Sequence, residues 1–285
     1  MITVTKRATL DLAKRATLAA YKTTGLQRGC MERTEFVERL DEELRTEDFA
    51  DVDASANGLQ VGSRDGTVER VAFAVDGVRE TFDRAVEFDA DALVVHHGLS
   101  WGGFERLTGR LYDRIERLVG NDVALYVSHL PLDGHQELGN AAGVADVLGL
   151  EDREPFGAYG PEYVGQRGVA GEPYGPAGLG DRLETELDIG GKPVRHLDFG
   201  PQEIENVAIV TGSGTDWLDE AVDVGADALV TGEGKGKAYH ETREAGIHVY
   251  LAGHYATETF GVRALRELVD SWGLETTYFD VPTGL

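Results

Sequence analysis

The sequence predicts an α/β fold of two pseudo-symmetric halves, each containing a βαβ unit and a parallel-type sheet. Two observations carry this prediction. Short, fully apolar runs alternate with longer amphipathic stretches, which is typical of buried parallel strands connected by helices. A segment that begins at Val71 also recurs without gaps 136 residues later, at Val207, so both halves follow one plan.

The repeat defines the strands of each unit. The aligned apolar runs are 71–75 with 207–211, then 90–94 with 226–230. An amphipathic helix is expected between the two runs of each half, and such a crossover places its strands side by side and parallel. A third apolar run follows in each half, at 123–128 and at 247–252.

The chain is expected to divide into four segments. A basic leader covers 1–30, the first α/β half covers 31–152, a small inserted region covers 153–203, and the second half, which completes the functional site, covers 204–285. The first half opens with an amphipathic helix at 33–44. The inserted region is rich in Gly and Pro but still predicts a strand at 163–170, a helix at 176–187 and a strand at 194–199.

The leader differs in charge from everything that follows it. It holds six Lys and Arg against one Asp, a balance of +5, so residues 31–285 carry −29 of the total charge of −24. One interpretation is a basic targeting or interaction arm. The other, which we favour, is translated upstream sequence before a native start at Met31.

The acidity of 31–285 predicts adaptation to concentrated salt, although an ordinary acidic enzyme is the simpler alternative. Self-repulsion of this size is screened over a Debye length of ~3 Å at 1 M salt. The same charge makes nucleic acid an unexpected partner, because binding to phosphates depends on Lys and Arg. No window approaches the roughly 18 apolar residues of a membrane span, and we expect a cytoplasmic protein.

Metal-binding residue types gather where three predicted strands end. They are His96 and His97 after the first, His129 and Asp133 after the second, and His254 and Glu258 after the third. Ligands bind at the carboxyl ends of parallel strands. The alternatives are a buried structural histidine with an exposed neighbour, and a Glu258 that favours a helix N-terminus. Pro131 makes a helical arrangement of His129 and Asp133 less expected.

These side chains also limit which metals suit the site. The chain has one cysteine, Cys30, which excludes a thiolate cage, while imidazole and carboxylate ligands accept Zn²⁺, Mn²⁺, Fe²⁺, Co²⁺ or Ni²⁺. The number of ligands exceeds one tetrahedral shell. Two divalent ions ~3.5–4 Å apart would use them all.

Other candidates lie in the second half. Glu233, Lys235, Lys237 and His240 follow its second strand, where the lysines would meet an anionic substrate or position His240 as a general acid or base; a solvated helix start explains them equally well. The Gly212-Ser213-Gly214 turn is either a phosphate cradle or a tight turn. We interpret His135, His196 and His248 as structural.

The motifs together resemble the NGG-one-interacting-factor-three-like family, whose members are named GTP cyclohydrolase I type 2 homologues. They are NGLQVG at 57–62, VHHG at 95–98, the segment 129–133, GSG at 212–214, TGE at 231–233 and GHYATE at 253–258. The resemblance implies a dinuclear metal site between the two halves, and a toroidal homohexamer whose sites face an internal cavity. It also implies five ligands, with Glu258 as the bridge and His129 beside the metals. The ligands are His96, His97, Asp133, His254 and Glu258.

The function predicted from these residues is that of a metal-dependent hydrolase, in which a metal-bridged hydroxide attacks a small polar substrate such as a nucleotide or an amide. His129 or His240 would transfer protons. No guanine-specific residue set is visible. The alternative is a non-catalytic metal-binding or interaction protein with a regulatory role.

Overall fold

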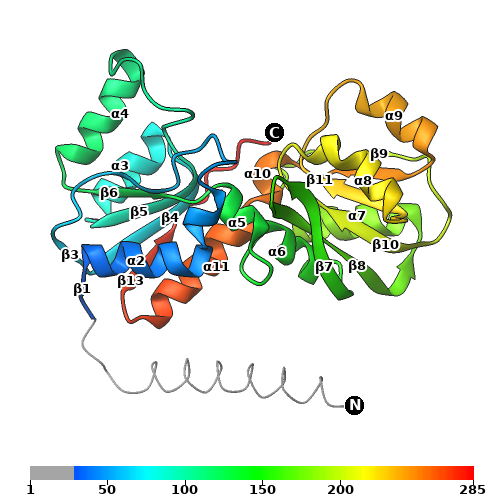
Figure 1. Ribbon diagram of the computed structural model, residues 1–285, viewed down its shortest axis with the longest axis horizontal. Coiled ribbons are helices and arrows are strands. Elements are labelled where there is room, and N and C mark those ends of the chain that lie inside the picture. The colour runs from blue at the N-terminus through cyan, green and yellow to red at the C-terminus, as the bar shows by residue number, and fades with distance from the viewer. Residues whose placement is uncertain (1–28) are drawn as a thin grey trace.

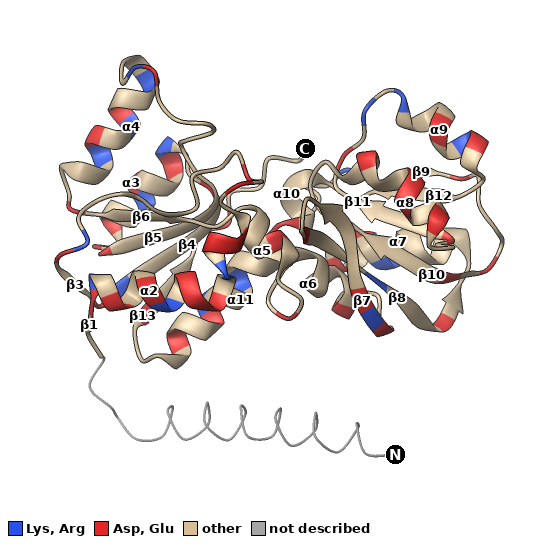
Figure 2. Ribbon diagram, in the orientation of Figure 1, with Lys and Arg blue, Asp and Glu red and all other residues tan. Residues whose placement is uncertain are grey.

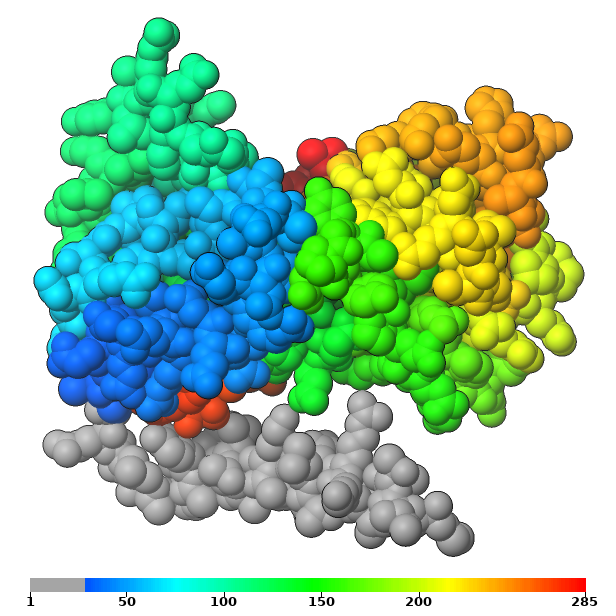
Figure 3. Space-filling model, viewed as in Figure 1, coloured from blue at the N-terminus to red at the C-terminus, as the bar shows by residue number. Residues whose placement is uncertain are grey.

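The computed structural model describes residues 29–285, which form two α/β lobes side by side (Figure 1). The prediction about the leader therefore lies outside the described residues, apart from its last two positions. The space-filling view shows the lobes meeting at a notch, where the C-terminal residues come to the surface (Figure 3).

The first lobe has a five-stranded sheet of order β13-β4-β5-β6-β2. Its strands are β2 (Gly58–Val61), β4 (Arg70–Asp76), β5 (Ala92–His97), β6 (Ala124–Val127) and β13 (Glu275–Tyr278). Helices α2 (Arg33–Leu44) and α11 (Thr259–Ser271) cover one face, and α3 (Arg79–Glu87) and α4 (Gly109–Val119) cover the other. Successive residues of β4 face opposite sides, so Phe73 packs under α2 and α11 while Ala74 packs under α3. A pair of two-residue strands, β1 (Met31–Glu32) and β3 (Thr67–Val68), lies beside α2.

The second lobe has a six-stranded sheet of order β7-β8-β10-β11-β12-β9. Its strands are β7 (Leu150–Tyr159), β8 (Glu162–Tyr174), β9 (Arg195–Leu197), β10 (Ile204–Ile209), β11 (Ala228–Thr231) and β12 (His248–Leu251). Helices α6 (Asn140–Val147) and α7 (Pro176–Glu186) pack on one face, and α8 (Leu218–Asp223), with α9 (Ala238–Ala245) beside it, packs on the other. The remaining short helices are η1 (Thr46–Phe49), α5 (Leu130–Gly134), η2 (Gly214–Trp217) and α10 (His254–Thr257).

The strand register confirms the internal repeat. Val71 pairs with Ala92 in the first sheet, and the equivalent residues Val207 and Ala228 pair in the second. Asp91 and Asp227 are also equivalent, and each accepts two backbone N–H bonds of 2.8–3.0 Å at the start of the neighbouring strand. The Ala-Asp pair that opens the second run of each repeat therefore fixes the alignment of its two strands.

The prediction of parallel-type sheets is correct only for the central strands, because both sheets are mixed. β2 runs antiparallel to β6, β8 runs antiparallel to β10, and β9 runs antiparallel to β12. β7 and β8 form a hairpin through a turn at Gly160, which has a φ of +64°. A tight turn reverses the chain direction, so these edge strands cannot be parallel to each other.

The chain is distributed between the lobes differently from the expected boundaries. The expected insertion at 153–203 supplies most of β7, together with β8, α7 and β9, so both edges of the second sheet come from it. The last segment returns to the first lobe, where β13 pairs in parallel with β4. Glu258 directly precedes α11, at the point where the chain passes between the lobes.

Acidic side chains are spread over the helices of both lobes (Figure 2). Across residues 29–285, no helix combines the length and apolar character that a membrane crossing requires.

Candidate metal centre

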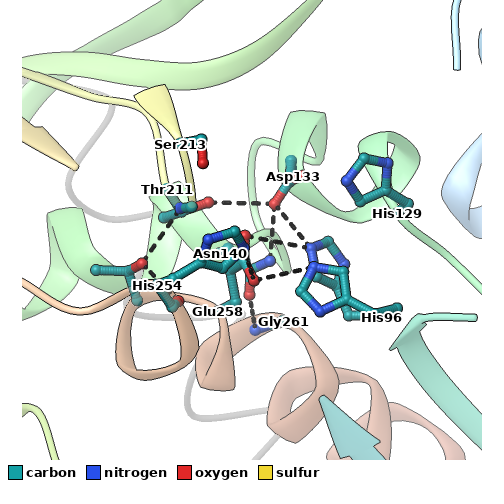
Figure 4. Close-up of polar contacts among 12 residues, drawn as sticks. His96, His129, Asp133, Asn140, Thr211, Ser213, His254, Glu258 and Gly261 are labelled. Carbon is teal, nitrogen blue, oxygen red and sulfur yellow. Dashed lines mark hydrogen bonds and ion pairs between the residues drawn. The ribbon is translucent and has the colours of Figure 1, made fainter. Parts of the chain in front are cut away.

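Residues from both lobes converge at one point. His96 and His97 end β5, Asp133 lies on α5, and His254 begins α10 at the end of the second lobe's strand β12. Although neighbours on a strand point to opposite sides, the strand ends here and the ring centroids of His96 and His97 lie 4.6 Å apart. Figure 4 shows His96, Asp133, His254 and Glu258 directed toward one another, with His129 to one side.

Glu258 lies at the centre of this cluster. Its Oε1 is 3.6 Å from Nε2 of His96, whereas its Oε2 is 3.2 Å from Nε2 of His97 and 3.1 Å from Nε2 of His254. Nε2 of His96 is also 3.6 Å from Oδ1 of Asp133. Two groups of three ligand atoms result, His96–Asp133–Glu258 and His97–His254–Glu258, and they share the one carboxylate.

Two atoms of the cluster are buried and unsatisfied. Nε2 of His96 and Oε2 of Glu258 have no hydrogen-bond partner among the described residues, and both side chains are almost completely inaccessible. A buried polar atom without a partner costs about 1–3 kcal/mol. Divalent ions beside these atoms would satisfy both, so the residues fit a metal centre.

All four histidines are held by their other ring nitrogen. Nδ1 lies within 2.8–3.1 Å of an oxygen acceptor in each case. The acceptors are the Ser128 carbonyl for His96, Asp76 for His97, Asp53 for His129 and Glu233 for His254. Each contact places the proton on Nδ1 and leaves the lone pair of Nε2 facing the cluster. Metal-binding histidines show the same arrangement.

Electrostatics inside the cluster favour charge separation. Burial opposes protonation of His96, but the Asp133 and Glu258 carboxylates outweigh it and raise the pKa to about 10. Burial is likewise outweighed at His254, where Glu258 and Glu233 raise the pKa to about 9. Burial alone would raise the pKa of Glu258, yet His96 and His97 hold it well below its usual value. Protons thus balance the carboxylates where cations would otherwise do so.

Asp133 is fixed by contacts from both lobes. Its Oδ1 accepts hydrogen bonds from Nδ2 of Asn140 at 2.8 Å and from Oγ1 of Thr211 at 3.1 Å. The expectation that Pro131 disfavours a helix here is wrong. Pro131 lies in the first turn of α5, where its missing N–H has no intrahelical acceptor, and the Asp133 N–H bonds the His129 carbonyl at 3.1 Å.

A cleft of about 530 Å³ opens onto the cluster. His97, His129, Asp133, His254 and Glu258 line its polar end. Its walls are largely apolar and include Trp101, Leu130, Tyr159, Val164, Val210 and Trp217. The cleft therefore combines a charged end with aromatic walls.

His240 is not brought into the site. It is exposed on α9, makes a ring contact with Tyr239 and does not line the cleft, because the loop after β11 carries the start of α9 away from the cluster (Figure 1). Lys235 and Lys237 pair with Asp216 on the surface. Of the residues predicted to transfer protons, only His129 lies at the cluster.

The Gly212-Ser213-Gly214 turn is built for close packing rather than for a phosphate. The N–H of Gly212 donates to Oγ1 of Thr257 at 3.3 Å, and the N–H of Gly214 donates to Oγ1 of Thr231 at 2.8 Å. Two of the three backbone donors that a phosphate cradle would use are already engaged.

Sequence reasoning missed the carboxylates behind the histidines. Asp76 ends the first apolar run of the first repeat, so the strand-end argument that found His96 applies to it as well. Glu233 was considered only beside the lysines, although it occupies the position equivalent to His97 in the repeat. Asp53 lies in a loop with no pattern, and its Oδ2 also accepts the Leu130 N–H at 2.9 Å.

Comparisons with known proteins agree with this geometry. The family model Duf34/NIF3 (NGG1p interacting factor 3) matches residues 31–283. The GTP cyclohydrolase 1 type 2 homolog of the halophilic archaeon Halobacterium salinarum is 56% identical over 255 residues, which cover 90% of this chain and all of that one. The homolog from Pyrococcus abyssi is 42% identical over 256 residues, with 90% and 100% covered.

The fold agrees as well. The crystal structure of TTHA1606 from Thermus thermophilus superposes with a TM-score of 0.80 at 40% identity, over 90% of this chain and all of that one. The chain therefore belongs to the Duf34/NIF3 (NGG1p interacting factor 3) family, as its motifs predicted.

Proposed function

We propose that the protein is a dinuclear metal-dependent hydrolase that acts on a small polar substrate. The proposed ligands are His96, His97, Asp133, His254 and Glu258. The sharing of Glu258 between two ligand groups is the observation that supports this most directly, because its two oxygens face different histidines. Two divalent ions ~3.5–4 Å apart are commonly bridged in this way. When bound, they supply Lewis acidity and a water activated for attack at neutral pH.

His129 is the residue placed to transfer a proton. Its Nδ1 contacts Oδ1 of Asp53 at 2.9 Å, and its backbone N–H donates to Oδ1 of Asn57 at 2.8 Å. The hydrogen bond from His129 outweighs burial and lowers the pKa of Asp53. The carboxylate thus orients the ring and leaves Nε2 as the nitrogen that accepts or donates the proton at the cleft.

The cleft supports a substrate with a flat or apolar part. Trp101 and Trp217 line it together with Tyr159, and the ring of Trp101 lies 4.9 Å from that of His129 in an edge-on contact. Such walls suit a ring-bearing compound whose polar group reaches the cluster. The name carried by the relatives makes GTP one compound to test, beside other nucleotides, phosphodiesters and small amides.

The test compares metal content and turnover in molar KCl. We expect Glu258→Gln to lose metal and activity together, because one neutral amide cannot serve both ligand groups. His129→Asn should keep the metals and lower turnover by about 100-fold or more. His240→Asn, on exposed α9, is the matched control and should change neither.

Full metal occupancy in Glu258→Gln would contradict the proposal. Two bound metals without turnover on any substrate class would instead favour the alternative, a regulatory metal-binding protein.

We also propose that the protein forms a homohexamer. Trp101, Phe104, Leu107 and Tyr112 are exposed along one stretch of the first lobe, and their apolar area supports burial against another copy. Light scattering in molar KCl should give six times the chain mass, and a monomeric mass would contradict this part of the proposal.

A further inference from the structure

A second cluster of metal-binding residue types lies at the other end of β12 from the candidate metal centre. His248 begins β12, whereas His254 follows its end, and His196 lies on the neighbouring edge strand β9. Asp198 comes directly after β9. One ligand atom from each of His196, Asp198 and His248 lies within 4.8 Å of the other two.

We propose that His196, Asp198 and His248 form a mononuclear site for a divalent transition-metal ion of the zinc type, separate from the centre at Glu258. Two imidazoles and one carboxylate provide three protein ligands, which leaves a fourth tetrahedral position for water. The proposal is independent of the hydrolase function.

The spacing of the ligand atoms suits one ion. Nε2 of His196 is 3.1 Å from Nδ1 of His248, and Oδ1 of Asp198 is 3.4 Å from the same Nδ1. Metal–nitrogen bonds of about 2.0–2.1 Å in tetrahedral geometry place neighbouring ligand atoms about 3.3 Å apart. Both distances agree with that separation.

The protein also holds His248 with the correct nitrogen free. Nε2 of His248 contacts the Pro201 carbonyl at 2.7 Å, so the ring proton lies on Nε2 and the lone pair on Nδ1. The Gly200 N–H approaches Nδ1 at 3.4 Å, a long contact that an ion would replace. A Cβ at position 200 would lie 2.5 Å from Cδ2 of His248, so only glycine lets the backbone pack against this buried ring.

His196 is oriented by a different neighbour. Its ring stacks on Tyr250 with centroids 4.2 Å apart and planes 8° from parallel, and the Tyr250 hydroxyl donates to the Pro176 carbonyl at 2.7 Å. Burial and the nearby His248 lower the pKa of His196, which keeps the ring neutral as a ligand must be. Asp198 is largely exposed, so an ion has a path from solvent.

Without metal, the same contact is a hydrogen bond from His196 Nε2–H to His248 Nδ1. The experiment must therefore separate a metal site from a paired histidine. Zn²⁺ binding is measured by titration against a chromophoric chelator in molar KCl, with the Glu258→Gln variant as the starting protein so that the central cluster contributes less.

We expect His196→Asn in this background to remove one Zn²⁺ equivalent per chain. Its affinity for that ion should fall by more than about 100-fold, since losing an outer partner of a ligand already costs about 10- to 100-fold. Asp198→Asn, at an exposed position that tolerates change, should weaken the same ion. His240→Asn removes an exposed histidine outside the cluster and should leave the stoichiometry unchanged.

An anomalous difference map of Zn²⁺-soaked wild-type crystals should show a peak between His196 Nε2 and His248 Nδ1. Equal Zn²⁺ stoichiometry in His196→Asn and its parent, or a map with no peak at these nitrogens, would overturn the proposal and leave a hydrogen bond between two histidines.

Discussion

Gly212 and Glu258 pack so closely that a Cβ atom at position 212 would overlap Oε1 of the carboxylate and lie 3.2 Å from Nε2 of His254. The backbone at Gly212 also has a φ of +60°. The turn from the second lobe therefore fixes the position of the residue that joins the two ligand groups.

Gly212→Ala should displace Glu258 and reduce the metal content. We expect a loss of about 1–3 kcal/mol in the free energy of unfolding, from overpacking together with the left-handed backbone. Gly225→Ala is the matched control, because Gly225 has a φ of +73° but nothing within 4 Å of its added Cβ. It should lose stability and keep its metals. If Gly212→Ala binds metal as well as Gly225→Ala does, the packing argument fails.

Glu233→Ala should weaken metal binding by about 10- to 100-fold, the usual cost of losing a partner behind a histidine ligand. Glu233 contacts Nδ1 of His254 at 3.1 Å and accepts the Ser213 hydroxyl at 2.5 Å. Glu241→Ala removes the same charge from α9, where Glu241 faces Lys237, and serves as the control. Isothermal titration with Co²⁺ compares the two, and equal affinities would show that Glu233 does not support the site.

The metal-free protein should lose stability as the pH rises above neutrality. The pKa values of about 10 for His96 and about 9 for His254 lie above the ~6.5 of an unfolded histidine. Their stabilisation is therefore complete below about pH 6.5 and is lost as the pH rises through 9 to 10. Metal binding displaces these protons, so the metal-induced gain in Tm should grow over the same range.

Thermal unfolding in molar KCl, with and without a chelator, measures both trends. Glu258→Gln should flatten the fall in the chelated protein. A chelated wild-type Tm that stays constant from pH 6.5 to 10 would contradict the assignment of these protons.

Concentrated salt should stabilise the fold. The chain carries a formal charge of −24, and its acidic side chains cover both lobes (Figure 2). Screening of their mutual repulsion predicts a Tm that rises with KCl into the molar range. A flat profile would show that the acidity does not limit stability.

Local patterns accounted for the parts of the fold that repeat. The run at Val71 and its copy at Val207 predicted the central strands, and the strand-end positions predicted that His96, His254 and Glu258 would meet. The edge strands and the return of β13 to β4 depend on contacts between distant segments, which no local period records. Asp53 was missed for the same reason, since it reaches His129 from a loop 76 residues earlier.

The location of bound metal tests the central claim most directly. A crystal structure of the Mn²⁺- or Zn²⁺-loaded protein, with anomalous difference maps, should show two peaks ~3.5–4 Å apart at the cluster. One should contact His96 and Asp133, the other His97 and His254, and Glu258 should contact both. A single peak that leaves either group without an ion, or ions that do not touch Glu258, would contradict the account.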